Sequence, residues 1–372
     1  MKILFITPFN IFPPFWGGGQ RTYHFVKNLA EEHDVVLIMP SFKQFENEKG
    51  EEYEEFFRNR MKVFSIGHWI KLPVVEYLNP FMALKCVIEA FSSDVIFCDY
   101  PWSGVYALLA HFLAQKPVIF NEHNIEWEVK KQTGAKYVLL MKILEKILCK
   151  ISKKIVVVSE LEAKKLKEYF GVNEKRIVVI ENGFDEERFY PRNKEKMKKK
   201  LGIDFPMVLF LGKLDYAPNV EAVNLIYTEI LPRVLRKRKD VKFFVIGGGR
   251  RKMLNMHHPS LIFVGTVKNV EEYVGAADVV IVPLLKGGGT RIKILEALAA
   301  GKKVITTSKG CEGLEELKEF LIIEDDWKKF AQRILEEIEK EEKDVVAPIE
   351  NRCWKKLCEK LKEVVKSVQR NG

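Results

Sequence analysis

A run of three glycines between cations, Lys286–Arg291 (KGGGTR), joins a short apolar stretch to a helical pattern over Arg291–Ala300. Glycine leaves backbone N–H groups uncovered, and a helix N-terminus attracts anions. We expect Thr290 to be the N-cap and Arg291 and Lys293 to lie in the first helical turn, where cations oppose the helix dipole. A bound anion would compensate that placement, so the segment, including Gly288 and Gly289, predicts a phosphate cradle.

Glu296 lies one helical turn further on, in a segment that is otherwise apolar on all sides (ILEALAAG). A carboxylate in such a setting needs a partner. Its two oxygens suit the hydroxyls of a ribose diol, and the alternative is a structural salt bridge to Lys293.

A second glycine run, Gly17, Gly18 and Gly19, precedes a helix that we expect over Arg21–Glu32. Bare N–H groups at a positive helix end suit an anion, so the run is a candidate acceptor or phosphate loop. The alternative is a plain flexible turn. A third run, Gly247–Gly249, lacks the spacing of a dinucleotide-binding fingerprint.

Two further loops carry side chains suited to a substrate. Phe12, Phe15 and Trp16 form an unusually aromatic loop, which would line an acceptor pocket, touch lipid or pack on a neighbouring domain. His123 follows a predicted strand within Asn121–Trp127 (NEHNIEW), at a position where ligands bind in open α/β sheets. The alternative is a histidine that is hydrogen-bonded within its own loop.

Short β-branched and aromatic runs alternate with helical patterns such as Tyr137–Cys149 and Val220–Arg236, which is typical of βαβ units and a parallel sheet. In the first half we expect strands over Lys2–Thr7, Val35–Met39, Val63–Ile66, Val95–Cys98, Val118–Asn121, Ile155–Ser159 and Ile177–Ile180. In the second half we expect them over Met207–Gly212, Lys242–Ile246, Leu261–Gly265, Val279–Pro283, Lys303–Thr307 and Leu321–Ile323.

The two series of strands predict two doubly wound α/β domains that face each other across a cleft. Residues 1–184 form the first domain, 206–350 form the second, and 351–372 are an amphipathic helix expected to begin at Asn351. Residues 185–205 read as a linker because apolar periodicity is lost there and a charge run ends at proline.

Composition narrows the class of protein. The chain has 372 residues, of which 47% are hydrophobic and 30% charged, so disorder and disulfide-stapled miniproteins are excluded. The formal net charge is +10, and nearly all of the excess lies in residues 186–372. That excess indicates either a solvated surface or an anionic ligand. The six scattered cysteines contain no Cys-x-x-Cys pair, which favours a reducing, cytoplasmic location.

Contact with a membrane remains open at this stage. No window approaches the roughly 20 apolar residues of a membrane span. The segment AKYVLLMKILEKILCKISKK combines a Leu/Ile/Met stripe with six lysines, as interfacial helices do. The stripe either packs in the core or makes peripheral contact at the inner face of the membrane.

Taken in order, these motifs resemble those of the retaining glycosyltransferases of family four, which have the GT-B fold. The resemblance covers nearly the whole chain. It rests on the opening strand with its glycine loop, His123, VVVSELEAKKL, VIENGFDEERFYP, LFLGKL, VIGGG and GGGTRIKILEALAAGKKVITT. The last motif is the most specific, and it places the chain with the GGGTR-type sequences.

The resemblance implies that the second domain binds a nucleotide-diphosphate sugar and the first binds a glycan, lipid-linked or small-molecule acceptor. It implies that the terminal helix crosses back onto the first domain. Glu296 matches the glutamate that holds the ribose hydroxyls, and Gly289 and Thr290 match positions whose amides meet the phosphates. His123 matches the histidine at the transferred sugar, and Lys213 matches a basic residue, usually arginine, that faces the diphosphate.

Two positions depart from the family pattern. The first glutamate of the paired motif is replaced by Gly288, and the second family cation is not evident after Lys213, so Arg291 or Lys293 would supply that charge. These departures concern the contacts that select the sugar. By the same resemblance His123, Glu296, Lys213 and Arg291 are the expected catalytic residues, with no metal and no cofactor beyond the donor.

Other functions stay under consideration. One is a GT-B epimerase or inverting transferase acting on the same donors, and another is a nucleotide-sugar-binding protein without catalysis. A nucleic-acid binder would account for the positive charge, but no nucleic-acid-binding motif is present. The expected partners are therefore a nucleotide-sugar and an acceptor, with no nucleic acid.

Overall fold

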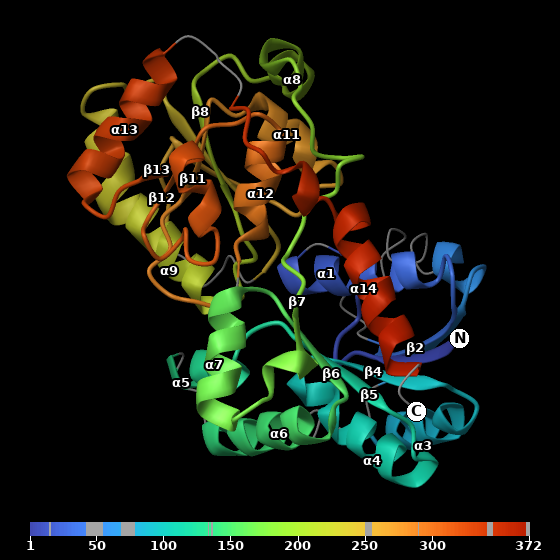
Figure 1. Ribbon diagram of the computed structural model, residues 1–372. Coiled ribbons are helices and arrows are strands. Elements are labelled where there is room, and N and C mark those ends of the chain that lie inside the picture. The colour runs from blue at the N-terminus through green and yellow to red at the C-terminus, as the bar shows by residue number, and fades with distance from the viewer. Residues whose placement is uncertain are drawn as a thin grey trace. The chain divides into compact units, whose positions relative to one another are not determined.

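The computed structural model describes residues 1–14, 16–41, 55–67, 79–132, 134, 137–249, 255–288, 290–340 and 345–369. Phe15 and Gly289, both singled out above, lie outside the described residues. The chain divides into two compact units (Figure 1). Unit 1 consists of Met1–Asn182 and Trp354–Gly372, and unit 2 consists of Gly183–Cys353.

Unit 1 is built on a parallel sheet with the order β3-β2-β1-β4-β5-β6-β7. The central strands are continuous apolar runs buried on both faces, as expected when helices cover a parallel sheet on both sides. The strands are β1 (Lys2–Ile6), β2 (Asp34–Pro40), β3 (Lys62–Ile66), β4 (Val95–Asp99), β5 (Val118–Glu122), β6 (Lys154–Val157) and β7 (Ile177–Val179).

The helices of unit 1 connect these strands, and the last one comes from the end of the chain. They are α1 (Gly17–Leu29), α3 (Pro80–Phe91), α4 (Gly104–Ala114), α5 (Glu126–Gln132), α6 (Val138–Ile151), α7 (Glu160–Phe170) and α14 (Trp354–Gln369). Short 3₁₀ turns lie at Pro101–Ser103 and Glu174–Arg176. Helix α14 packs on α1, where the Trp354 ring stacks on His24 with 5.2 Å between centroids. The ammonium of Lys362 pairs with Glu32 at 3.0 Å.

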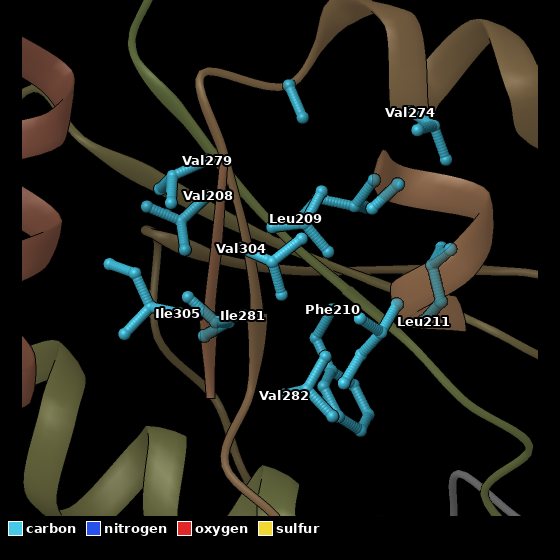
Figure 2. Packing of buried hydrophobic residues seen from close by; sticks show 14 of the residues in the cluster. Val208, Leu209, Phe210, Leu211, Val274, Val279, Ile281, Val282, Val304 and Ile305 are labelled. Carbon is cyan, nitrogen blue, oxygen red and sulfur yellow. The ribbon is translucent and has the colours of Figure 1, made fainter. Parts of the chain in front are cut away.

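Unit 2 has a parallel sheet with the order β10-β9-β8-β11-β12-β13. Figure 2 shows the part of its core in which apolar side chains of β8, β11 and β12 pack together. The strands are β8 (Met207–Leu211), β9 (Lys242–Ile246), β10 (Leu261–Gly265), β11 (Val279–Val282), β12 (Val304–Thr306) and β13 (Ile322–Ile323).

The helices of unit 2 are α8 (Lys194–Leu201), α9 (Ala217–Leu225), α10 (Leu231–Leu235), α11 (Val270–Ala276), α12 (Ile292–Ala299) and α13 (Trp327–Glu339). A π-helical turn, Ile226–Ile230, joins α9 to α10. The sequence predicted one regular helix there, but the change of spacing comes just before Pro232, which cannot donate a backbone hydrogen bond. Short 3₁₀ segments lie at Glu315–Phe320 and Glu350–Arg352.

Four predicted helix starts differ from the structure, and one of them is α9, which begins at Ala217 instead of Val220. Helix α1 begins at Gly17 instead of Arg21, because Gln20 N already donates to Trp16 O at 2.8 Å. The N-cap of α12 is Arg291 instead of Thr290, and no side chain caps that helix. Helix α14 begins at Trp354 after the 3₁₀ turn instead of at Asn351.

Within the described part of the chain, no helix is long and apolar enough to cross a membrane. Numbered within its own unit, the unit 2 sheet has the order 3-2-1-4-5-6, and the unit 1 sheet has the same order with a seventh strand added. In each sheet the strand order reverses between the first and fourth strands. Ligands of doubly wound folds bind at the carboxyl ends of the strands at this reversal. In unit 1 that point lies between β1 and β4, and in unit 2 it lies between β8 and β11.

Candidate active site

In unit 2 the loop after β8 and the start of α12 are joined through one buried amide. Asn219, in α9, donates from Nδ2 to the backbone carbonyl of Lys213 at 2.9 Å. Its Oδ1 accepts from Nζ of Lys293 at 3.1 Å. The Lys213 ammonium also pairs with Asp215 at 3.1 Å. Asn219 therefore links the backbone at Lys213 to the ammonium of Lys293 at the point where the strand order of the sheet reverses, and sequence reasoning had missed it.

Lys293 is a half-buried cation with an unusual acidity. Its ammonium lies 4.7 Å from the centroid of the ring of Phe210, which belongs to β8. Burial and the neighbouring charge of Arg291 lower the pKa of Lys293 to about 7, whereas Glu296 opposes this shift. A nearby anion would restore the charged form.

Arg291 turns back onto its own loop. Its guanidinium donates to the carbonyl of Gly287 at 3.0 Å and to that of Gly288. Burial lowers the pKa of Arg291, and Tyr216 and Glu312 partly offset that effect. The side chain thus shapes the glycine loop that the sequence identified as a phosphate cradle.

Thr290 and Glu296 lie on the buried side of this loop and helix. The Thr290 hydroxyl has no hydrogen-bond partner among the described residues, although the side chain is more than nine-tenths buried. Its methyl group leaves no space for a side chain at Gly313, where a Cβ would lie 2.8 Å from Cγ2. Glu296 is equally buried, within the second turn of α12.

The glycine run after β9 has a structural role. Gly247 and Gly249 have φ of +151° and +129°. A Cβ at Gly247 would lie 2.1 Å from the carbonyl oxygen of Gly212, and one at Gly249 would lie 2.7 Å from the Asp215 nitrogen. These glycines therefore let the loop after β9 lie directly against the loop that carries Lys213.

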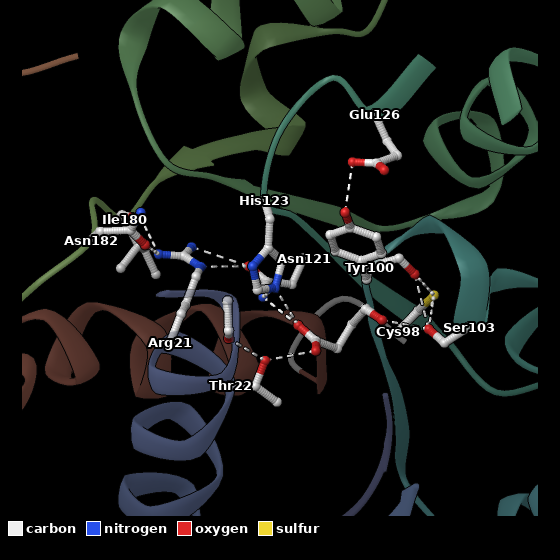
Figure 3. Close-up of polar contacts among 12 residues, drawn as sticks. Arg21, Thr22, Cys98, Tyr100, Ser103, Asn121, His123, Glu126, Ile180 and Asn182 are labelled. Atoms are coloured by element: carbon white, nitrogen blue, oxygen red, sulfur yellow. Dashed lines mark hydrogen bonds and ion pairs between the residues drawn. The ribbon is translucent and has the colours of Figure 1, made fainter. Parts of the chain in front are cut away.

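In unit 1 a buried polar network surrounds His123 (Figure 3). Nε2 of His123 lies 2.8 Å from Oδ1 of Asp99 and 3.1 Å from the Asn121 amide nitrogen. Asp99 also accepts from Asn121 at 2.7 Å and from Thr22 at 2.8 Å. Burial raises the pKa of Asp99, but His123, Asn121 and Thr22 together bring it below its usual value. Asp99 thus presents a fixed carboxylate to the imidazole.

Arg21 completes this network from the first turns of α1. Its guanidinium donates to Oδ1 of Asn121 at 3.1 and 3.2 Å and to the Ile180 carbonyl at 2.8 Å. Burial lowers the pKa of Arg21 to about 9, with Asp99 opposing. Arg21 therefore links α1 to the ends of β5 and β7. Its sequence position carried no signal, because a lysine or arginine in a helix is ordinarily solvated.

Aromatic rings lie beside the imidazole. Phe9 has its ring centroid 6.4 Å from that of His123 and 4.4 Å from that of Trp16. Tyr100 lies 5.3 Å from His123 and has φ of +71°, which is uncommon for a residue with a side chain. Its hydroxyl donates to Glu126 at 2.6 Å. Strained residues of this kind gather at functional sites.

The predicted anion loop at Gly17, Gly18 and Gly19 is the first turn of α1, and an indole covers it. A Cβ at Gly18 would lie 2.4 Å from the Trp16 ring, and one at Gly19 would lie 2.9 Å from it. The small size of these glycines therefore admits the Trp16 ring against the helix end.

The loop that carries His123 is held from behind by buried carboxylates. Glu145 of α6 accepts from the N–H groups of Glu126 at 2.6 Å and Trp127 at 3.3 Å, and Glu162 of α7 accepts from Ile125 N at 3.3 Å. Burial raises the pKa of Glu145 to about 9. Burial and the adjacent Glu145 raise that of Glu122 well above its usual value. These shifts favour the protonated forms of Glu122 and Glu145, which lessens the repulsion between the two carboxyl groups.

Two protein families match successive parts of the chain. Residues 16–188 match the family described as Glycosyltransferase Family 4, and residues 205–340 match the family described as Glycosyl transferases group 1. Together the two matches span most of both units.

Individual relatives have low sequence identity to this chain, but each matches most of its length. The O-antigen biosynthesis glycosyltransferase WbnH of Escherichia coli is 23% identical over 264 residues, covering 69% of this chain and 68% of that protein. A phosphatidyl-myo-inositol mannosyltransferase of Propionibacterium freudenreichii is 25% identical, covering 83% of this chain and 77% of its own. The crystal structure of Anabaena HepE with UDP and glucose superposes with a TM-score of 0.76 at 17% identity, covering 99% of this chain and 100% of that one. That likeness shows the GT-B fold.

Proposed function

The chain belongs to family 4 of the glycosyltransferases, and from that premise we propose which of its residues bind and transfer the sugar. It is a nucleotide-sugar glycosyltransferase that retains the anomeric configuration. The proposal assigns the donor to unit 2 and the acceptor to unit 1.

The observation that carries the proposal is the chain of contacts from Lys213 through Asn219 to Lys293 at the reversal point of the unit 2 sheet. Asn219 fixes the backbone of Lys213 and the ammonium of Lys293 beside a helix N-terminus, and two cations placed there suit a diphosphate. Lys213 and Lys293 bind the two phosphates in this proposal. The cation missing from the family pattern is then replaced by Lys293 of α12.

The remaining residues of the cradle complete the donor site. Gly288, Gly289 and Thr290 meet the phosphates through their amides, and the buried Thr290 hydroxyl, unpartnered among the described residues, supplies a further donor. Glu296 accepts hydrogen bonds from the ribose hydroxyls. Arg291 acts by holding the carbonyls of Gly287 and Gly288, so that the loop keeps its shape.

Sugar transfer depends on stabilising the negative charge that develops on the leaving diphosphate. The bond between the anomeric carbon and the leaving phosphate oxygen breaks as the acceptor oxygen bonds to the same face of the sugar. The acceptor proton passes to the leaving phosphate, so no protein nucleophile is used. Helix amides, Lys213 and Lys293 stabilise the charge that develops on the diphosphate. His123, oriented by Asp99, contacts the transferred sugar.

The nature of the donor and acceptor is proposed by analogy with the relatives. HepE is described in complex with UDP-glucose, so UDP-sugars are the first donors to test. The Propionibacterium relative is named for a phosphatidyl-inositol acceptor. We propose a lipid-linked acceptor and peripheral contact with a membrane. The six cysteines are all buried and unpaired, which supports work in a reducing compartment.

Substitution of Glu296 tests the donor site. Glu296→Ala is expected to raise the donor Kd by at least about tenfold and to lower turnover, because a charged hydrogen bond contributes about 1.5–3 kcal/mol. Isothermal titration with UDP-sugars measures this. The matched control is Glu337→Ala, which removes another buried carboxylate of unit 2, on α13. Unchanged donor affinity in Glu296→Ala overturns the assignment.

A further inference from the structure

Unit 1 exposes a large apolar surface on three neighbouring helices, α3, α4 and α6. The three cover the same face of the sheet (Figure 1), and Gly104 of α4 lies so close to α6 that a Cβ would be 2.5 Å from Leu148. The exposed apolar side chains are Phe81, Leu84, Ile88 and Phe91 of α3, Val105, Leu109, Phe112 and Leu113 of α4, and Leu139, Leu140, Ile143 and Ile147 of α6. We call this set the three-helix face.

The face is not a by-product of core packing. Helix α6 buries one stripe, with Met141, Leu144 and Leu148 in the core, and still exposes a second apolar stripe. Leu139 is 71% exposed and Phe112 is 60% exposed. The sequence had offered core packing and lipid contact as alternatives for α6, and the structure shows one apolar side in the core and a second apolar side exposed. Exposed apolar side chains that gather on neighbouring helices mark an interaction surface.

The net charge of the three helices that form the face is positive. The exposed charged residues of α6 are all lysines, Lys142, Lys146 and Lys150, and the one acidic residue of that helix, Glu145, is buried. Helix α4 contains no lysine, arginine, aspartate or glutamate. On α3, Glu89 is neutralised by Lys85 at 2.8 Å and by Lys2 at 3.5 Å.

We propose that the three-helix face docks unit 1 on the surface of an anionic lipid bilayer. Apolar side chains entering the headgroup boundary, with lysines level with the phosphates, are the features of an interfacial membrane contact. A symmetric contact with a second copy fits less well, because it would bring each lysine row toward its own counterpart. The inference extends the proposed lipid-linked acceptor but does not depend on which sugar is transferred.

Flotation of the full chain with lipid vesicles tests the docking. The probes are vesicles of phosphatidylcholine alone and vesicles of phosphatidylcholine mixed with phosphatidylglycerol. The wild-type protein is expected to float with the mixed vesicles, to bind them more weakly as salt is raised, and to bind the neutral vesicles several-fold less. Absence of binding to the mixed vesicles overturns the proposal.

The apolar contribution is tested by Phe112→Glu combined with Leu139→Glu. Both side chains are exposed, so the fold should tolerate the change, and binding should fall by at least about tenfold. The control is Val346→Glu, which places a charge on an 82% exposed valine of unit 2. Equal binding by the double variant and the control overturns the proposal.

The lysines are tested by Lys146→Glu combined with Lys150→Glu. Binding to the mixed vesicles should fall by about fivefold or more for each charge reversed. The control is Lys237→Glu combined with Lys239→Glu, two exposed lysines of unit 2. Equal loss in both pairs overturns the specific role of α6.

Two parallel measurements separate this inference from other failures. Sedimentation is expected to give the same mass for the wild-type protein and Phe112→Glu/Leu139→Glu. A wild-type dimer that the double variant dissociates, without vesicle binding, would assign the face to a second copy and overturn the proposal. The donor Kd of the double variant should stay unchanged, so a failure of the donor site is visible independently.

Discussion

At the scale of single residues, function depends on groups whose charge the fold controls. Lys293 has a pKa of about 7 because it is buried beside Arg291. Asp99 stays ionised because three donors surround it. In both cases an asparagine holds the charged side chain in place: Asn219 contacts Lys293, and Asn121 contacts Asp99. Neither asparagine belonged to a strong sequence pattern.

Donor affinity should fall as pH rises above 7. The free protein loses the Lys293 proton with a pKa of about 7, whereas a bound diphosphate favours the ammonium and raises that pKa. Between the two values binding takes up a proton, so Kd rises by up to about tenfold per pH unit. Titration calorimetry from pH 7 upward measures the effect. Lys293→Met should flatten the profile, and the control Lys303→Met should retain it.

Asp99→Asn should lower kcat by about 100-fold, because a small misplacement of a substrate-contacting group costs that much. Affinity for the nucleoside diphosphate without the sugar should not change, because we assign its phosphates and ribose to unit 2, whereas Asp99 belongs to unit 1. Asp278→Asn is the control, a unit 2 carboxylate that accepts from Met207 N at 2.7 Å and from Lys198 at 2.6 Å. It should lose stability and keep its kcat. Normal turnover by Asp99→Asn would refute the positioning role.

At the scale of elements, loops at the strand ends are positioned by close backbone contacts. The loop after β9 supports the loop after β8 because glycines occupy the contact. Helix α1 begins against the Trp16 indole, and the loop that carries His123 is held by carboxylates from α6 and α7. The loops that carry Lys213 and His123 are therefore held in place by contacts within their own units.

Two glycine substitutions separate crowding from backbone strain. Gly249→Ala should destabilise the protein by about 1–3 kcal/mol and also weaken donor binding, because its Cβ would displace the loop of Lys213. Gly265→Ala has a φ of +83° but open space, so it should cost stability alone. Urea unfolding and donor titration measure both. Equal donor affinity in the two variants would contradict this role of the β9 loop.

At the scale of the whole molecule, the chain contains two sheets with the same strand order, each with its own core. The acceptor and donor roles that we propose are thereby assigned to separately packed units. The net charge of +10 is spread over many solvated lysines. Only Lys213 and Lys293 are proposed to meet the diphosphate.

A nucleotide-sugar should stabilise the protein unevenly. At 100 times Kd, binding adds about 2.7 kcal/mol to the native state. Hydrogen exchange should slow at residues 212–219 and 284–296 of unit 2 and stay unchanged in β1–β7. Screening UDP-, GDP- and ADP-sugars by Tm identifies the base. Protection confined to unit 1 would refute the assignment of the donor.

The sequence by itself determined the elements and the family. Every predicted strand is present, and its bounds agree with the prediction to within two residues. The agreement is close because strands buried in a parallel sheet have short, continuous apolar sequences. The GGGTR segment and His123 were recognised because glycine runs and strand-end histidines are local patterns. Helix starts were less predictable, since Trp16 and Arg291 act through contacts that a linear pattern does not display.

Only the tertiary structure decided which polar groups work together. Asp99, Asn121 and Arg21 are distant in sequence. They meet because β4 and β5 end, and α1 begins, at one point of the sheet. Asn219 joins Lys213 to Lys293 for the same reason. The three-helix face was also undecided by sequence, because an amphipathic pattern does not reveal whether a second apolar side is covered. Burial and long-range contact are properties of the folded chain, and they fixed these choices.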